Sequence, residues 1–492
     1  MHFNIKNILV SQGFKHKDQY KNIYINLYEA VKNAIITKAL KKNTKLPPSR
    51  VLAKDLGVSR STVIKAYDLL MLEKYINSIP GSGYFISWTH NESNTDYLKI
   101  AVVDGNYPKI SKLAKSFKKN IHIIQNSSRG IAFRPGLPPL DIFPVQQWKN
   151  LSNDYWKTVQ PSQLTYGNTL GLKELRKNIA SYLKIYRNID CNYEQVVITS
   201  GSLHSLFLVG SILIDPTDGV AIENPTYPSA YNLFKSLKAK VHSIPVDDDG
   251  IVVDEINDKK VKLVYTTPSN QYPSGVKLSM ERRIALLNWA SQNGALVVED
   301  DYDHEFSNWE NPLPSIFSLD TQQRVVYLGT FNKLLHPSLR IGYMILPDYL
   351  IDSVKALYSQ SSRFVPTSIQ HTLSAFLEKD YLNKHLRRVI EVSIERKKVF
   401  MESFKLNFED KIYLDASHTG LHLIGNLKDE VDDYTLSKHL VKNGIITYPY
   451  SNYFAKGEKK SGLVLGYCSV NNKLIKEQVN KMSEAYMEFE NN

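Results

Sequence analysis

Residues 325–346 carry the sequence VVYLGTFNKLLHPSLRIGYMIL, and the organisation of the chain follows from this stretch. Its two apolar runs, VVYLG and RIGYMIL, predict buried strands, and the loop between them holds one lysine, Lys333. An amine held among apolar strands is desolvated, which lowers its pKa and makes it a nucleophile toward an aldehyde. A lysine exposed in an ordinary loop is the alternative that these residues leave open.

Two polar side chains accompany Lys333 in this loop. Thr330 precedes the lysine and Arg340 follows it. A hydroxyl and a guanidinium are suited to binding a phosphate group. A reactive lysine beside a phosphate site is what pyridoxal 5'-phosphate (PLP) needs in order to form a Schiff base with a protein.

The size and composition of the chain limit its class. A chain of 492 residues is too long for one ordinary core, so we expect two or three domains. The start of the chain lacks a signal-peptide pattern, and the longest apolar run, near LFLVGSILI (206–214), is too short to span a membrane. We therefore expect a cytoplasmic protein without a membrane partner. Cys191 and Cys468 form neither a disulfide framework nor a metal-ligand spacing, so no metal site is expected.

The net charge of +12 is concentrated near the N-terminus. Residues 1–90 hold 14 Lys and Arg against 5 Asp and Glu, residues 91–128 hold 6 against 3, and the remainder is neutral. A small basic region on a neutral body indicates nucleic-acid binding confined to that region. A basic tail that only aids solubility is the alternative.

The basic region has the pattern of a compact helical domain. Apolar residues from Tyr20 to Ile35 recur at helical spacing. Ser49 and Ser59 are expected to cap a second and a third helix, which are separated by a turn at Gly57. Residues 76–86, INSIPGSGYFI, predict a β-hairpin with PGSG at its tip.

These elements resemble the GntR-type winged helix-turn-helix, through LPPSRVLAKDLGVSRSTVIKAYDLL (46–70) and GSGYFI (81–86). The resemblance implies a DNA-binding domain over residues 18–86, with a purely structural three-helix domain as the alternative. Polar and cationic side chains at the start of the third helix can reach bases and phosphates in the major groove. The expected DNA-contacting residues are Ser49, Arg50, Ser59, Arg60, Ser61, Thr62, Lys65, Gly81, Ser82 and Gly83.

Residues 87–128 have no sustained periodicity and are expected to form a linker, with one helical turn at 109–119. Its lysines either extend the DNA footprint or are simply solvated. Residues 129–492 alternate strand-like runs with helical stretches, which predicts an α/β domain with a largely parallel sheet covered on both sides. Polar motifs follow the strands, at the sheet edge where such folds bind ligands: TSGSLHSL (199–206), ENPTYPSA (223–230), TTPSNQYPSG (266–275) and EDDYDHEF (299–306).

Together these motifs resemble a fold-type I aminotransferase, from YGNTLGLKELRKNIASYL (166–183) through LRIGYMILP (339–347) and more loosely to the C-terminus. The resemblance implies PLP as cofactor and a small C-terminal α/β domain after the large one. It implies that Lys333 forms the internal aldimine, that Asp300 holds the pyridine nitrogen protonated and that Tyr302 bonds the phenolic oxygen. The remaining implied contacts are Tyr227 on the ring, and Thr330, Arg340, Gly201 and Ser202 at the phosphate.

With a GntR-type head on such a body, the chain is identified as a member of the MocR (GabR-like) subfamily of bacterial transcription regulators. The resemblance implies a head-to-tail, domain-swapped homodimer that binds operator DNA. PLP, or its adduct with an amino acid or amine, would shift the heads between DNA-binding arrangements and so control genes of vitamin B6 or amino-acid metabolism. An active aminotransferase with an accessory DNA-binding head is the alternative, and a structural dimer without cofactor is a third interpretation.

The sequence also departs from a working aminotransferase. A transaminase usually grips the substrate carboxylate with an arginine of the small domain. This chain has no arginine after Arg396, and the strand where one is expected reads SGLVLGYCSV (461–470). Arg363 in SSRFVP, or a lysine, is the substitute that the sequence offers, and TFNKLL has fewer hydroxyls than the commoner TFSKS. These departures favour sensing over turnover, and vitamin B6 supply over amino-acid metabolism.

Overall fold

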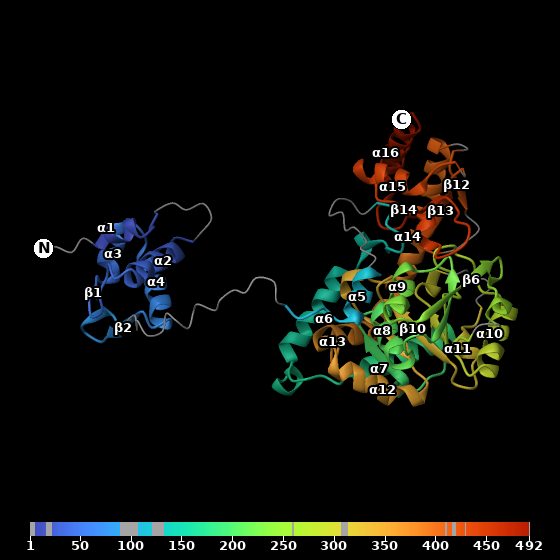
Figure 1. Cartoon of the computed structure of the whole chain (residues 1–492), viewed down its shortest axis with the longest axis horizontal. Coiled ribbons are helices and arrows are strands. Elements are labelled where there is room, and N and C mark those ends of the chain that lie inside the picture. Colours follow the sequence, from blue (N-terminus) through green and yellow to red (C-terminus); the bar gives the residue numbers. More distant parts are fainter. Residues whose placement is uncertain are drawn as a thin grey trace. The chain divides into compact units, whose positions relative to one another are not determined.

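A computed structural model of the chain describes residues 5–15, 22–88, 107–120, 132–257, 260–306, 313–408, 411–415, 420–428 and 430–491. The chain divides into two compact units, Met1–Pro108 and Lys109–Asn492, drawn in blue and in cyan to red in Figure 1. We call the first unit the head and the second the body. The division falls inside the region that the sequence predicts to be a linker.

The described part of the head consists of helices and a small antiparallel sheet. Its helices are α1 (Ile5–Ser11), α2 (Ile23–Ile36), α3 (Ser49–Leu56) and α4 (Arg60–Leu72). Its strands are β1 (Lys45–Leu46), β2 (Ile76–Ile79) and β3 (Gly83–Ile86), in the order β1-β3-β2. The helix-turn-helix and the hairpin that follows it are confirmed. Sequence reasoning missed α1 and β1, whose Leu9 and Leu46 lie in the core of the head.

The ends of α3 and α4 follow from local chemistry. Gly57 ends α3 in the left-handed conformation at φ 67°, which a glycine adopts without steric cost. The Ser59 side chain accepts a hydrogen bond from the Thr62 backbone N–H at 3.1 Å, so the predicted cap of α4 is confirmed. The predicted cap of α3 is wrong, because Ser49 is the first helical residue and Pro48, which has no side-chain acceptor, occupies the cap position.

Tyr67 connects α4 to the rest of the head. This side chain is fully buried, and its hydroxyl donates to the Pro47 carbonyl at 2.9 Å. Its ring meets the ring of Tyr84 in β3 edge to face, with centroids 4.7 Å apart. The exposed face of α4 and the hairpin are therefore held by one buried aromatic contact.

The body is built on an eight-stranded sheet in the order β4-β11-β10-β9-β8-β5-β6-β7 (Figure 1). Its strands are β4 (Val196–Thr199), β5 (Gly219–Asn224), β6 (Lys240–Asp247), β7 (Gly250–Ile251), β8 (Leu263–Thr266), β9 (Leu296–Asp300), β10 (Val325–Thr330) and β11 (Gly342–Ile345). The five neighbours from β10 to β6 run parallel, whereas β11 and β7 pair antiparallel. The predicted α/β fold with a largely parallel sheet is confirmed.

Helices cover both faces of this sheet. The first half of the set is α5 (Lys112–Lys119), α6 (Val145–Thr158), α7 (Lys173–Arg187), α8 (Ser202–Leu213) and α9 (Pro228–Ser236). The second half is α10 (Met280–Gln292), α11 (Ile316–Leu319), α12 (Ile351–Gln360) and α13 (Thr367–Glu378). Successive residues of β10 point to opposite faces of the sheet. Val326 packs into the core under α8, α9 and α12, and Tyr327 packs into the core on the other face, beside α7 and α13.

A smaller unit follows at the C-terminal end of the body, drawn in orange to red in Figure 1. Its antiparallel sheet has the order β12-β13-β15-β14, and the helices α14, α15 and α16 pack with it around one core. The strands are β12 (Tyr413–Asp415), β13 (His422–Asn426), β14 (Tyr448–Pro449) and β15 (Gly462–Gly466). The helices are α14 (Tyr381–Phe408), α15 (Asp433–Lys442) and α16 (Asn472–Glu490). The small α/β domain implied by the sequence resemblance is confirmed.

Among the described helices, none is long and apolar enough to cross a membrane.

Candidate functional site

Lys333 lies in the loop after β10, at the carboxyl end of the parallel strands. Its Nζ donates a hydrogen bond to the Gly136 carbonyl at 2.9 Å. Gly136 has a φ of +68°, which favours glycine, and a Cβ at that position would displace Lys333 Nζ from the carbonyl. Burial lowers the pKa of Lys333, while the nearby carboxylates of Asp303 and Asp300 oppose the shift. The lysine is therefore desolvated, as the sequence predicts.

Asp300 and Tyr302 present unpaired polar atoms at the same place. One carboxylate oxygen of Asp300, Oδ2, accepts from Tyr265 at 2.8 Å, whereas Oδ1 has no hydrogen-bond partner among the described residues. The buried Tyr302 hydroxyl also lacks a partner there. Burial raises the pKa of Asp300 to about 7. A buried carboxylate with a free oxygen is costly unless a cation reaches it, and the protonated ring nitrogen of PLP is such a group.

These side chains line a cavity of about 110 Å³ that is partly open to solvent. The residues around it are Ser202, Tyr227, Tyr265, Thr267, Tyr272, Asp300, Tyr302 and Lys333. Five of these eight are among the sequence-predicted cofactor residues. Sequence reasoning missed Tyr265, Thr267 and Tyr272, although the last two lie in the TTPSNQYPSG motif that it had singled out.

The predicted phosphate ligands gather at the first turn of α8. Gly201 precedes this helix with a φ of 112°, and a Cβ there would lie 3.8 Å from Arg340 Nη2. The Arg340 guanidinium thus lies close to the N-terminus of α8, and the two can bind an anion together. Thr330 ends β10, and its hydroxyl accepts from the Asn332 backbone N–H at 3.2 Å. Thr330 is not one of the residues that line the cavity.

Asp303 is a buried acid that sequence reasoning did not assign. It is 1% exposed, and its Oδ1 accepts from Asn270 Nδ2 at 2.9 Å. Its Oδ2 has no partner among the described residues. Burial raises the pKa of Asp303 to about 8, although the hydrogen bond from Asn270 and the charge of Lys333 lower it. The signal for this residue was its place in the acidic motif EDDYDHEF, three residues after Asp300.

A buried ion pair fixes the loop that carries these acids. Arg187 at the end of α7 contacts Asp301 at 2.7 Å and donates to the Ser269 hydroxyl at 2.7 Å. Tyr327 of β10 donates to the same carboxylate at 2.8 Å. Burial alone would raise the pKa of Asp301, but the charge of Arg187, together with His304 and the hydrogen bonds from Ser269 and Tyr327, outweighs burial and holds that pKa well below its usual range. Asp301 is thereby anchored behind the sheet while Asp300, its neighbour in sequence, faces the cavity.

The strand expected to carry a carboxylate-binding arginine instead contributes to an aromatic cluster. Val464 of β15 packs with Ile424, Tyr450 and Tyr453, and Tyr272 is packed against the same cluster. Neither Arg396, the last arginine of the chain, nor Arg363, the substitute that the sequence offers, lines the cavity. Arg396 is held by Asp141 and the Cys468 carbonyl, both at 2.6 Å. Arg363 is exposed and lies over the Tyr166 ring at 4.9 Å.

Arg134 is a cation near β15 that sequence reasoning missed. Phe133 forms a β-bridge with Gly466, which brings the segment before Gly136 against the end of this strand. The charge of Arg134 opposes the increase that burial causes in the pKa of Tyr448, the residue opposite Val464 in the sheet. Only the tertiary pairing of residues 133 and 466 reveals this proximity.

In the head, hydrogen bonds connect some of the predicted DNA contacts at the starts of α3 and α4. Arg60 Nε donates to the Ser49 hydroxyl at 3.5 Å, and the Ser59 and Ser61 hydroxyls are 2.8 Å apart. Lys65 lies over the Tyr24 ring at 5.6 Å. The exposed members of the predicted set are Arg50, Ser59, Arg60, Ser61, Lys65, Gly81 and Ser82, and the half-buried ones are Ser49, Thr62 and Gly83.

Comparison with known proteins matches both units. Residues 23–86 match the family described as bacterial regulatory proteins, gntR family, and residues 136–460 match aminotransferase class I and II. The probable rhizopine catabolism regulatory protein MocR of Rhizobium meliloti is 32% identical over 94% of this chain and 94% of its own length. The chain belongs to the MocR-like transcriptional regulators of the gntR family.

Other relatives agree with this assignment. The pyridoxine biosynthesis transcriptional regulator PdxR of Corynebacterium glutamicum is 27% identical over 94% of this chain and 96% of its own. An archaeal alanine:glyoxylate aminotransferase matches in structure with a TM-score of 0.68 and 26% identity, covering 77% of this chain and 96% of the other. The fold of this MocR-like regulator is thus a gntR-type helix-turn-helix followed by an aminotransferase fold, which implies PLP.

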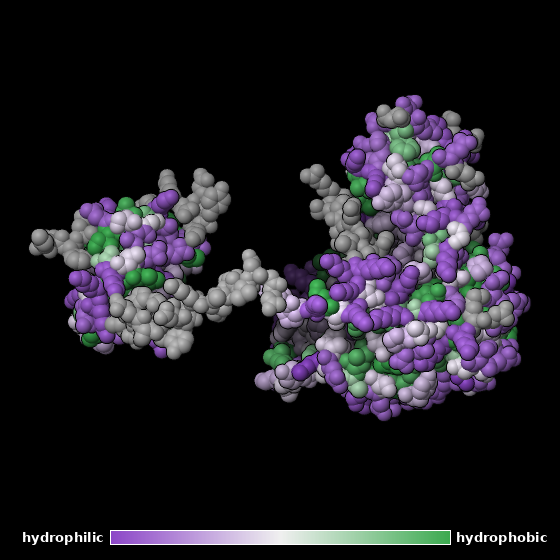
Figure 2. All heavy atoms as spheres, viewed as in Figure 1, coloured by the Kyte–Doolittle hydropathy of each residue, from purple (hydrophilic) through white to green (hydrophobic). Residues whose placement is uncertain are grey.

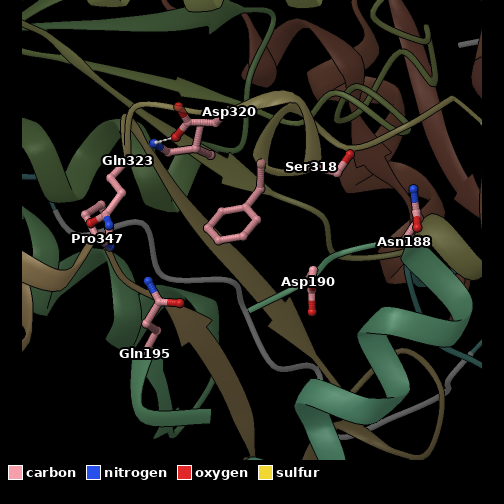
Figure 3. A pocket seen from close by; sticks show the side chains of 9 residues that line it. Asn188, Asp190, Gln195, Ser318, Asp320, Gln323 and Pro347 are labelled. Atoms are coloured by element: carbon pink, nitrogen blue, oxygen red, sulfur yellow. Dashed lines mark hydrogen bonds between the residues drawn. The ribbon is translucent and has the colours of Figure 1, made fainter. Parts of the chain in front are cut away.

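A second hollow of the MocR-like body lies at the other end of the sheet (Figure 3). Gln195, just before β4, and Val325, the first residue of β10, border it, whereas Lys333 follows the carboxyl end of β10. Its polar groups bond within the protein, since Asp320 accepts from the Val325 backbone N–H at 2.9 Å and Gln323 donates to Asp348 at 2.9 Å. This hollow therefore offers no ligand group comparable to those around Lys333.

Proposed function

We propose that this MocR-like regulator binds PLP covalently through Lys333 and that the state of this site controls operator binding by the head. The observation that supports the proposal is the pairing of a desolvated Lys333 amine with the free Oδ1 of Asp300 around one cavity. When bound, PLP supplies an aldehyde that an amine can attack and a ring that accepts electrons. The buried polar atoms that are left unpaired fit this group.

The residues around the cavity take distinct roles in this proposal. Asp300 binds the protonated ring nitrogen, and the Tyr302 hydroxyl donates to the phenolic oxygen. Tyr227, which is half-buried and lines the cavity, packs on the ring. The phosphate binds at Gly201, Ser202 and Arg340, with Thr330 supporting the loop. Gly136 receives the Lys333 amine when no aldehyde is attached.

In this proposal the head is the part of the protein that binds operator DNA. We assign to α4 the reading of bases in the major groove and to the β2–β3 hairpin contact with the backbone, because the exposed polar residues gather on these elements. The active form is proposed to be a head-to-tail, domain-swapped homodimer. As a DNA-binding regulator it would act in the cytoplasm.

Aminotransferase turnover is the second candidate function. The aminotransferase class I and II match over residues 136–460 favours it. Against it stands the position of β15, where Val464 packs among tyrosines. Because β15 carries no arginine, a standard amino acid lacks its usual carboxylate partner on this strand, and Arg134, which lies near Tyr448, is the cation that turnover would have to use instead. We therefore propose vitamin B6 supply as the controlled pathway, with amino-acid metabolism second.

The test uses the full-length protein and Lys333→Ala, with Lys355→Ala on the surface of α12 as control. Reduction with borohydride followed by mass spectrometry is expected to label Lys333 in the wild type and the control, and not in Lys333→Ala. Operator binding is expected to respond to PLP in the wild type and the control, and not in Lys333→Ala. If PLP, with or without added amines, leaves wild-type operator binding unchanged, the sensing proposal is wrong. Fast multi-turnover conversion of an amino acid and a keto acid would favour the aminotransferase.

A further inference from the structure

The helix α5 brings a second basic surface to the body. Five exposed lysines lie on or just before this helix: Lys109, Lys112, Lys115, Lys118 and Lys119. Phe117 turns inward and meets Phe207 of α8 with ring centroids 6.5 Å apart, and the Ser116 hydroxyl donates to the Lys235 carbonyl at 3.4 Å. The helical turn predicted at 109–119 within the linker is therefore present as α5, which docks on α9.

The surface under α5 is basic as well. Lys235, Lys238 and Lys240, at the end of α9 and the start of β6, are exposed. We call these three and the five lysines of the α5 region the lysine patch. Figure 2 shows hydrophilic side chains gathered over this part of the body.

No carboxylate balances the lysine patch among the described residues. Residues 107–120 and 225–246 contain no Asp or Glu, and none of the eight lysines forms an ion pair with a described residue. Asp218 is an acid that the backbone brings to the patch, since its carbonyl accepts from the Lys240 backbone N–H at 2.8 Å. Its carboxylate contacts Lys262 at 3.1 Å instead. The fold thus keeps the positively charged lysines of the patch close together although they repel one another.

We propose that the lysine patch binds the DNA phosphate backbone outside the bases that α4 reads, a second contact surface that rests on the proposed operator binding. Duplex DNA carries one negative charge per about 1.7 Å, so an eight-residue helix of about 12 Å faces several phosphates. Residues 89–106 join the hairpin of the head to this surface and span at most about 65 Å. Binding by the head therefore raises the local concentration of DNA at the patch.

The experiment measures operator affinity against salt concentration on two duplexes, one limited to the footprint of the head and one extended by two helical turns on each side. The variant is Lys112→Gln, Lys115→Gln and Lys119→Gln combined. The control is Lys398→Gln, Lys405→Gln and Lys476→Gln, which removes three exposed lysines from α14 and α16. Exposed Lys→Gln changes keep helix propensity, so both proteins are expected to fold.

The salt slope is the slope of the logarithm of the binding constant against the logarithm of salt concentration. On the extended duplex its magnitude is expected to fall by about 0.9 for each phosphate contact that the variant loses, so by about 2 to 3 in all for the three lysines. The control, and the variant on the short duplex, keep the wild-type slope. Equal slopes for variant and control on the extended duplex overturn the proposal. So does a variant that loses binding to phosphatidylglycerol vesicles while its DNA slope is unchanged. Failure of the wild type to bind any operator would instead contradict the proposed function, and the slopes on nonspecific duplex would still test the patch.

Discussion

At the scale of single residues, the site combines one amine with acids that the fold keeps out of water. Asp300 is the last residue of β9, and Asp303 follows it in the next loop. Burial raises the pKa of Asp300 to about 7 and that of Asp303 to about 8. Each has one oxygen without a partner among the described residues. Asp300 faces the cavity where a cofactor ring fits. Asp303 lies near Lys333 and opposes the fall in the pKa of that lysine.

We expect Asp303→Asn to change stability in a pH-dependent way. The folded protein holds the Asp303 proton more tightly than the unfolded chain, whose pKa is near 3.8, so this residue lowers stability as pH rises from about 4 to about 8. The asparagine of this variant stays neutral and keeps an oxygen for Asn270. The stabilisation by Asp303→Asn, measured by urea unfolding without cofactor, should therefore be greater at about pH 8 than at about pH 5, by roughly 4 kcal/mol.

The matched control for this measurement is Asp248→Asn, a change in an exposed turn after β6. It should leave the difference between the two pH values as in the wild type. An effect of Asp303→Asn that is equal at both pH values would show that the carboxyl does not carry the assigned pKa.

At the scale of elements, α4 depends on its first turn. Two serines look alike in the sequence as helix caps, yet only Ser59 occupies the cap position, and Ser49 is already inside α3. The difference arises because Pro48 has a non-helical ψ of 144° and therefore occupies the cap position itself, which places Ser49 inside α3. The start of α4 also carries the exposed polar residues assigned to DNA.

Ser59→Ala is expected to destabilise the head by about 1 kcal/mol, since the Thr62 backbone N–H loses its side-chain acceptor and keeps only the Ser59 carbonyl. For a domain of this size the loss corresponds to a fall in Tm of about 4–8 °C. Ser49→Ala removes no cap and should shift the Tm much less. Calorimetry of the full chain measures both variants, and equal shifts would contradict the role of Ser59.

At the scale of the whole molecule, the head and the body have separate cores. The core of the head is built from residues between Ile5 and Ile86, while the cores of the large sheet and of the C-terminal unit lie within residues 132–486. A ligand stabilises the unit that binds it in the folded state. The two units can therefore respond separately.

We expect two thermal transitions, of which PLP raises only that of the body. At a concentration 100 times the dissociation constant, the stabilisation is about 2.7 kcal/mol. Calorimetry with and without PLP checks this, and Ser59→Ala identifies the transition of the head. A single transition that PLP and Ser59→Ala both shift would show that the units unfold together.

Much of the fold was predictable because it depends on local patterns. Apolar runs located β4, β5, β8, β9 and β10, and helical periodicity located α2, α4, α7, α8 and α10, since burial sets the spacing of apolar residues along each element. The short strands β1, β7 and β14 have too few residues to show a period. Motifs at strand ends pointed to Lys333, Asp300, Tyr302 and Tyr227, because parallel strands bring their carboxyl ends to one edge.

The sequence by itself determined the two-unit organisation, the largely parallel sheet and the lysine at its edge. Tertiary structure alone decided that Gly136 accepts from Lys333, that Phe133 brings Arg134 to β15 and that α5 docks on α9. The physical reason is the range of the interactions. Periodicity and caps act within a few residues, whereas these contacts join segments more than one hundred residues apart, and only the packing of the whole chain sets which of them meet.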